Sequence, residues 1–250
     1  MTKKTVETKK TVDAPKSGEH QKPPVALVLE LEYMLFPGRQ LMFEAFGGVL
    51  KNHQIALNQS AFSRYGLPRA IEKALQGLLP ALGKKGLAAE GIADKIKQQF
   101  ESSLNESANV PRPELAALLQ KAAENNVKIG LLSFLPQEDA DRLMARLSLN
   151  PPACLHVMNK KADDLPTPDS WLSLLKTMAV VPRCAIALVD NALACKSALA
   201  VGMRCCVVPD SFTQWQDFAG ADLVAENISE LKLDNILGLL TPAHFRERAK

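Results

Sequence analysis

The fold is decided by Val25-Ala26-Leu27-Val28-Leu29-Glu30-Leu31-Glu32-Tyr33-Met34-Leu35. This stretch begins as an unbroken aliphatic run, which is typical of a strand buried on both faces, and it then carries two acids one residue apart. Acids are costly in a core, but parallel α/β sheets bind their ligands beyond the carboxyl ends of the strands. Glu30 and Glu32 therefore indicate either a functional site or a strand end whose acids face water.

The composition is that of an ordinary globular protein. The 250 residues are 47% hydrophobic and 23% charged, which suits one α/β domain with an insertion or two small domains. No apolar run reaches the roughly 18 residues that cross a bilayer, and the N-terminus has no apolar signal segment. Five cysteines without a CxxC motif predict buried, reduced thiols. We therefore expect a cytoplasmic protein without a membrane span.

The first 24 residues differ from the rest of the chain. They hold six lysines against three acids and almost no large apolar side chain, so they account for the whole net charge of +3. We predict a disordered, Lys-rich tail at 1–24, with a weak electrostatic tether to an anionic surface as the alternative role. Because bases and acids balance in the remainder, no nucleic-acid partner is predicted.

Residues 40–109 show helical periodicity. Apolar side chains recur three and four positions apart in three groups, at 41–50, 71–79 and 92–104. No convincing strand interrupts these groups. We predict an α-helical cap at 40–109, inserted after the first strand, whose apolar faces form its own core.

Helices and strands alternate from Val110 onward. Strands are predicted at 127–132, 154–158, 184–189, 204–208 and 223–224, with helices between them and a last helix at 228–240. Such repeated units imply right-handed crossovers and a parallel sheet covered by helices on both faces. The expected fold class is α/β, with the core at 25–39 and 110–240 and a C-terminal tail at 241–250.

Polar side chains end or directly follow three of the predicted strands. They are Glu30 and Glu32 after the first strand, Ser133 after the second and Asp190 after the fourth. Because the carboxyl ends of parallel strands meet at one edge of the sheet, we expect these four side chains to converge.

At this point the chain resembles the haloacid dehalogenase (HAD) superfamily, in its branch of β-phosphoglucomutase-like and phosphoglycolate-phosphatase-like proteins with a helical cap. Four motifs carry the resemblance, in the family's order and over about residues 25–240. The first, Asp-x-Asp-Gly-Thr/Val-Leu, corresponds to Glu30-Leu31-Glu32-Tyr33-Met34-Leu35, and the second, a strand ending in Ser or Thr, to 129–133. The third, Lys-Pro-x-Pro-Asp, corresponds to Leu165-Pro166-Thr167-Pro168-Asp169, and the fourth, a strand ending in acids before a small-residue helix, to 187–203. The resemblance implies a Rossmann-like parallel core with the inserted cap.

The resemblance also implies roles for particular residues. In the family the first aspartate attacks phosphorus and the second acts as general acid and base, while a serine and a lysine bind the phosphoryl oxygens. Glu30 and Glu32 would then be the catalytic positions and Ser133 the phosphate-binding hydroxyl. Magnesium would be held by Glu30, by Glu32 through its backbone carbonyl, and by Asp190. Lys160 and Lys161 are candidates to replace the phosphate-binding lysine, because Leu165 stands in its place.

The departures from the family pattern weaken the expected chemistry. Each glutamate moves its carboxylate by about 1 to 1.5 Å relative to aspartate, and a misplacement near 1 Å can cost on the order of 100-fold in rate. Tyr33 replaces a glycine and Met34 a small or β-branched residue, so both narrow the site. With three acids and fewer cations, either a metal still binds, a glutamate has a raised pKa, or the acids point to solvent.

Two functional hypotheses follow. The favoured one is a HAD-like pseudoenzyme that lacks or nearly lacks phosphoryl transfer and acts in binding or regulation, because both aspartates and the lysine are replaced. The alternative is a magnesium-dependent phosphohydrolase (phosphatase) of a small phosphorylated metabolite, with Glu30 as nucleophile or metal ligand and Glu32 as acid and base. Other chemistry on the same scaffold is a third class. Magnesium is expected to be weakly bound or absent, and the partner is either a small phosphorylated ligand or a protein.

The predicted cap offers few signs of a ligand. Its polar candidates for facing the cleft are His53, Arg64, Tyr65 and Arg69, with ordinary surface positions as the alternative interpretation.

Overall fold

The computed structural model describes residues 23–67, 70–84, 86–106, 110–158 and 166–240. The predicted C-terminal tail lies outside these ranges, as does the predicted N-terminal tail up to residue 22. Lys160, Lys161 and Leu165 also fall outside them.

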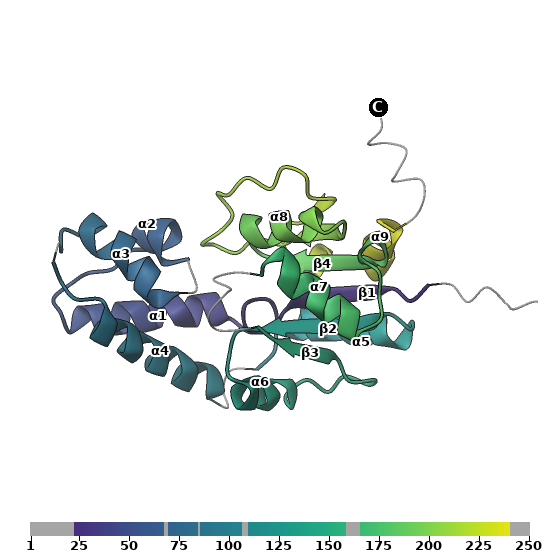
Figure 1. Cartoon of the computed structure of the whole chain (residues 1–250), viewed down its shortest axis with the longest axis horizontal. Coiled ribbons are helices and arrows are strands. Elements are labelled where there is room, and N and C mark those ends of the chain that lie inside the picture. Colours follow the sequence, from purple (N-terminus) through teal and green to yellow (C-terminus); the bar gives the residue numbers. More distant parts are fainter. Residues whose placement is uncertain (1–22, 68–69, 85, 107–109, 159–165, 241–250) are drawn as a thin grey trace, which may run out of the picture.

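The described strands form a six-stranded parallel sheet in the order β3-β2-β1-β4-β5-β6 (Figure 1). Their bounds are β1 Ala26–Glu30, β2 Lys128–Ser133, β3 Cys154–Val157, β4 Ala185–Val189, β5 Arg204–Val207 and β6 Leu223–Val224. The central strand β1 pairs in parallel with β2 and β4. The predicted α/β class, with its Rossmann-like parallel sheet, is confirmed.

Strand β1 is apolar from Ala26 to Leu29 because helices cover both faces of the sheet. Its Leu27 and Leu29 belong to the core cluster that includes α5 (Pro113–Glu124), whereas Ala26 and Val28 belong to the cluster with α7 (Pro168–Thr177) and α8 (Ala192–Ala200). Successive side chains of a strand point to opposite faces, so both faces need apolar residues. Each fully buried leucine contributes about 1.5 to 3 kcal/mol.

Helix boundaries follow local capping chemistry. Thr167 and Ser170 form a capping box at the start of α7, where Pro168 occupies the first turn. The Asn191 side chain accepts a hydrogen bond from the Ala194 N–H and begins α8. Helix α8 begins just after the carboxyl end of β4, and α7 is the first described helix after β3. Each polar cap therefore follows the carboxyl end of a strand.

The described helices from Gly38 to α5 lie beyond the carboxyl ends of the strands (Figure 1). They are α1 Gly38–Lys51, α2 Gln59–Ala61, the π-helical turn η2 Phe62–Gly66, α3 Ile71–Ala81 and α4 Glu90–Asn105. The three predicted helical groups are confirmed, and the described part of this segment contains no strand. Helix α6 (Gln137–Met144), which follows β2, contacts α4 of this group.

The predicted helix at 228–240 is wrong in its continuity. A 3-10 turn, η4 (Ile228–Glu230), is separated from α9 (Leu233–Gly238) by two residues in extended conformation. The break buries both Leu231 and Leu233, and side chains two positions apart share a face only in an extended chain.

Two further expectations can be compared with the described residues. Cys195, Cys205 and Cys206 are buried free thiols as predicted, whereas Cys154 and Cys184 are free but only partly buried. No described helix is long and apolar enough to cross a membrane.

Candidate functional site

The predicted site residues lie at the carboxyl edge of the sheet. Glu30 ends β1, and the following π-helical turn η1 (Leu31–Leu35) carries Glu32. Ser133 ends β2, and Asp190 follows β4. All four are buried, with exposures of 0% for Glu30, Glu32 and Ser133 and 3% for Asp190, so the alternative of acids that face solvent is wrong.

Glu32 is held by the end of the neighbouring strand. The Ser133 hydroxyl donates a hydrogen bond to Glu32 Oε1, and it accepts one from the Leu135 N–H at 3.2 Å. Burial raises the pKa of Glu32 from 4.5 to about 7, although the hydrogen bond from Ser133 acts in the opposite direction. Near neutral pH this carboxyl group therefore exists in both protonation states.

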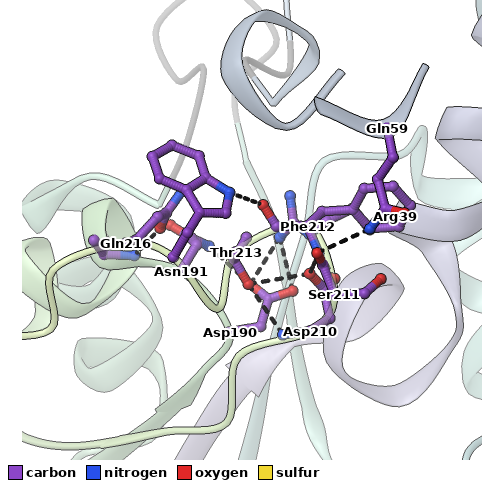
Figure 2. A network of polar contacts seen from close by, with 11 residues as sticks. Arg39, Gln59, Asp190, Asn191, Asp210, Ser211, Phe212, Thr213 and Gln216 are labelled. Carbon is purple, nitrogen blue, oxygen red and sulfur yellow. Dashed lines mark hydrogen bonds and ion pairs between the residues drawn. The ribbon is translucent and has the colours of Figure 1, made fainter. Parts of the chain in front are cut away.

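The cation at this edge comes from Arg39, in the first turn of α1. Arg39 is 3% exposed, and its Nη2 donates to both carboxylate oxygens of Asp190, at 2.8 and 2.7 Å (Figure 2). Its Nε donates to Asp210 Oδ2 at 2.9 Å. The guanidinium thus joins the acids that follow β4 and β5, and we call these three residues the Arg39 cluster.

The Arg39 cluster keeps its positive charge. Burial alone lowers the pKa of Arg39, but the carboxylates of Asp190 and Asp210 outweigh that effect and raise the pKa above its ordinary value. A cation in the first turn of a helix opposes the helix dipole, so the two acids are needed there. Burial also raises the pKa of Asp210, an effect that Arg39 opposes.

Further hydrogen bonds hold both acids of the cluster in place (Figure 2). Asn191 Nδ2 donates to Asp190 Oδ1 at 2.9 Å. Asp210 Oδ1 accepts from the Phe212 N–H at 2.8 Å and from the Thr213 hydroxyl at 3.1 Å. The two carboxylates are therefore satisfied by groups of the chain itself.

The residues between the first motif and α1 pack tightly against Arg39. The Arg39 guanidinium carbon lies 4.6 Å from the centre of the Tyr33 ring, which also contacts Phe134 at 5.2 Å between ring centres. A Cβ atom at Gly38 would lie 2.5 Å from the Glu32 carbonyl oxygen, so only glycine permits this approach of α1. Tyr33 therefore fills space beside the cluster, and its effect on a phosphate site stays a prediction.

Magnesium does not fit this arrangement. Both Asp190 oxygens lie within hydrogen-bond distance of the positively charged Arg39 Nη2, which a coordinated dication would have to displace. Within the described ranges, no group of three or more His, Cys, Asp or Glu side chains could hold a metal ion. Of the predicted ligands, Asp190 is thus paired with Arg39, and the roles of Glu30 and the Glu32 carbonyl toward magnesium stay a prediction.

The remaining predicted residues stay apart from this edge or outside the described ranges. Arg69, like Lys160 and Lys161, is not described. His53 and Tyr65 are half-buried, and Arg64 is exposed on η2. None of these three contributes to the Arg39 cluster.

Sequence reasoning missed Arg39 and Asp210. Asp210 follows the end of β5 closely, so the strand-end rule that identified Asp190 applies to it as well. Arg39 lay at the predicted boundary between core and cap, and the excess of acids over cations at the first motif was the signal that a basic residue was needed.

Comparison with known proteins extends the resemblance. No family model matches the chain. Protein CbbY of Cereibacter sphaeroides is 27% identical over 141 residues, which cover 54% of this chain and 60% of CbbY. The putative phosphatase YhcW of Bacillus subtilis is 23% identical over 216 residues, covering 85% of this chain and 96% of YhcW. The match to CbbY thus spans less than two thirds of that relative.

Solved structures share the fold. The crystal structure of CbbY from Rhodobacter sphaeroides in complex with xylulose-(1,5)-bisphosphate superposes with a TM-score of 0.67 at 20% identity. The superposition covers 83% of this chain and 96% of that one. The parallel sheet and the helices beyond its carboxyl edge therefore recur in a protein that binds a phosphorylated ligand.

Proposed function

Because the chain belongs to the haloacid dehalogenase superfamily, in its β-phosphoglucomutase-like and phosphatase-like branch, we propose that it is a binding or regulatory protein that has lost metal-dependent phosphoryl transfer. The observation that carries this proposal is the Arg39 guanidinium, bound to both oxygens of Asp190 and to Asp210.

Electrostatics supports the loss of the metal. Two unit charges of like sign 4 Å apart repel by roughly 4 kcal/mol at an effective dielectric constant of 20, and a dication doubles that repulsion. Moving Arg39 aside would instead leave a buried guanidinium without its carboxylates, which costs about 3 to 5 kcal/mol. Either route makes magnesium at Asp190 unfavourable.

The replaced residues of the first motif support the same conclusion. In-line attack depends on the position of the nucleophile, and Glu30 carries one methylene more than the family's aspartate. Tyr33 is 4% exposed and lies between Arg39 and Phe134, where the family has a glycine. A phosphate approaching Glu30 would meet a site with reduced space and no metal.

A phosphohydrolase remains the second candidate, and one observation favours it. The pKa of Glu32, raised to about 7 by burial, suits a general acid and base at neutral pH. The relatives of this chain named above include a putative phosphatase. In this version, Glu30 would attack and Ser133 would bind a phosphoryl oxygen.

The proposal also covers location and organisation. Five free thiols are compatible with a reducing compartment such as the cytoplasm. We propose that the helical segment at 40–109 acts as a cap over the core formed by 25–39 and 110–240. The ligand of such a protein would be a small phosphorylated molecule or a protein partner.

A phosphatase assay tests the main proposal. The purified protein is incubated with a panel of phosphate monoesters and magnesium, beside a Glu30→Ala variant and beside the same mixture with EDTA. We expect the parent and the variant to release phosphate at the same background rate. Turnover at least about tenfold above the variant, and abolished by EDTA, would instead establish the phosphohydrolase.

A further inference from the structure

A cavity separate from the Arg39 cluster lies between the helices after β1 and the loop after β5. Its volume is about 590 Å³, within the range of roughly 300 to 1,000 Å³ that small-molecule sites occupy. The described residues that line it are Gln59, Ser60, Ser63, Arg64, Ser211 and Trp215. None of the predicted catalytic or metal residues is among them, and we call it the α2–η2 cavity.

One segment supplies most of the polar groups. Gln59, Ser60, Ser63 and Arg64 all belong to the α2–η2 segment and line the cavity. Phe62 of the same segment packs against Phe43 and Phe212 with ring centres 5.3 Å apart in each case. This aromatic packing fixes the segment against α1 and the loop after β5.

The opposite wall presents an aromatic surface. Trp215 is 59% exposed, and its Nε1–H donates to the Phe212 carbonyl oxygen at 2.6 Å. This hydrogen bond satisfies the only polar atom of the indole and fixes the ring, so its exposed part can stack with a ligand. Gln59 Nε2 donates to the Ser211 carbonyl oxygen at 3.0 Å and joins the two walls (Figure 2).

We infer that the α2–η2 cavity binds a nucleoside monophosphate, with its base stacked on Trp215 and its phosphate bound by Arg64. Arg64 is the one charged residue among the described lining residues, so the cavity favours an anion. The hydroxyls of Ser60 and Ser63 can donate to phosphate or sugar oxygens. An exposed indole recognises a flat base through stacking.

This inference deepens the binding role proposed above, but it does not depend on the loss of phosphoryl transfer. The cavity and the Arg39 cluster share no described residue, and Phe43, Phe62 and Phe212 pack between α1, η2 and the loop after β5. Binding at the cavity can therefore be measured whether or not the edge of the sheet has activity.

Isothermal titration calorimetry of the full chain with AMP, in EDTA, tests the inference. Adenosine and ribose 5-phosphate serve as the two parts of the ligand. We expect saturable binding of AMP, with each part binding at least about tenfold more weakly, because charge-assisted hydrogen bonds and base stacking each contribute about that factor or more.

Variants locate the binding. Arg64→Met and Trp215→Ala should each weaken AMP binding by about tenfold or more, whereas Trp215→Phe should retain most of the affinity. Arg183→Met, which removes an exposed arginine of the 3-10 turn η3 (Pro182–Cys184), is the matched control and should bind as the parent does. Circular dichroism verifies that each variant is folded, and Trp215→Leu, which keeps an apolar side chain but has no ring to stack on, replaces Trp215→Ala if the latter is not.

Four results would overturn the inference. One is the absence of saturable AMP binding at millimolar concentration, and another is binding that both cavity variants leave unchanged. Equal affinity for ribose 5-phosphate and AMP would refute stacking of a base. Equal affinity for adenosine and AMP would refute the role of Arg64 toward phosphate.

Discussion

Arg39 and Arg64 lie on neighbouring helical segments, yet their surroundings differ completely. Arg39 is 3% exposed and donates to two carboxylates, whereas Arg64 is exposed on a wall of the α2–η2 cavity. In the Arg39 cluster the chain supplies its own counter-charge. In the cavity the guanidinium of Arg64 lies over the Tyr65 ring, 5.6 Å from its centre, and no carboxylate is among the described lining residues, so an anionic ligand can supply the counter-charge.

The difference separates two properties that a HAD-like fold ordinarily combines at one edge. The acids at the strand ends remain, but an internal arginine neutralises two of them and contributes to stability. Groups suited to recognising a ligand lie instead between α2, η2 and the loop after β5. Substitutions in the first region should therefore change the free energy of unfolding, and substitutions in the second should change binding.

The largest effect is expected from replacing the buried arginine. Arg39→Met leaves Asp190 buried and Asp210 partly buried without their cation, and it should reduce the free energy of unfolding by about 3 to 5 kcal/mol. Arg64→Met removes an exposed arginine and should change it by less than about 0.5 kcal/mol. Urea denaturation of both variants measures the difference. If both variants lost the same free energy of unfolding, the Arg39 cluster would contribute no more to stability than the exposed Arg64.

A pH-dependent effect of nearly the same size is expected at Glu32. The carboxyl group has a pKa of 4.5 when unfolded and about 7 when folded, so the unfolded chain releases its proton first as the pH rises. Glu32 therefore lowers the stability progressively between these two values, by about 3 kcal/mol in total, and the loss is complete above pH 7.

Glu32→Gln, which mimics the protonated acid, removes this loss. The variant should be as stable as the parent near pH 4 and up to about 3 kcal/mol more stable at pH 8. Urea denaturation at the two pH values measures it, and Glu72→Gln on the exposed side of α3 is the control. A variant that is no more stable than the parent at pH 8 would contradict the raised pKa.

A smaller effect tests the approach of α1 to the first motif. Gly38→Ala places a Cβ atom 2.5 Å from the Glu32 carbonyl oxygen, and it should destabilise the protein by about 1 to 3 kcal/mol. Gly47→Ala in the same helix meets no atom within 4 Å and should stabilise by about 0.5 to 1 kcal/mol. Thermal unfolding of both variants checks the contrast, which disappears if α1 can shift outward.

Much of the fold could be predicted because its signals are local. The apolar run of β1, the proline and threonine at the start of α7 and the periodicity of α1, α3 and α4 each lie within a few consecutive residues. The ends of parallel strands then brought Glu30, Ser133 and Asp190 to one edge. The last helix was predicted as continuous, but Leu231 and Leu233 are both buried, and side chains two positions apart share a face only in an extended chain.

The partners within the site could not be predicted in the same way. Arg39 is separated from Asp190 by 151 positions and from Asp210 by 171, and an ion pair over such distances leaves no periodic pattern. The α2–η2 cavity was missed for the same reason, since Trp215 joins Arg64 only in the folded chain. Arg64 was named as a candidate, but its sequence neighbours gave no reason to prefer it over a surface position.

The ion pair between Arg39 and Asp190 also restricts how this chain can evolve. Loss of either residue alone leaves the other charge buried, so the cost of a substitution at one position depends on the residue at the other. Metal binding at Asp190 would require removal of the arginine, and each intermediate with the arginine removed but no metal bound is expected to be less stable than its parent. Arg39 thus makes it unfavourable to reach a metal-binding site through single substitutions.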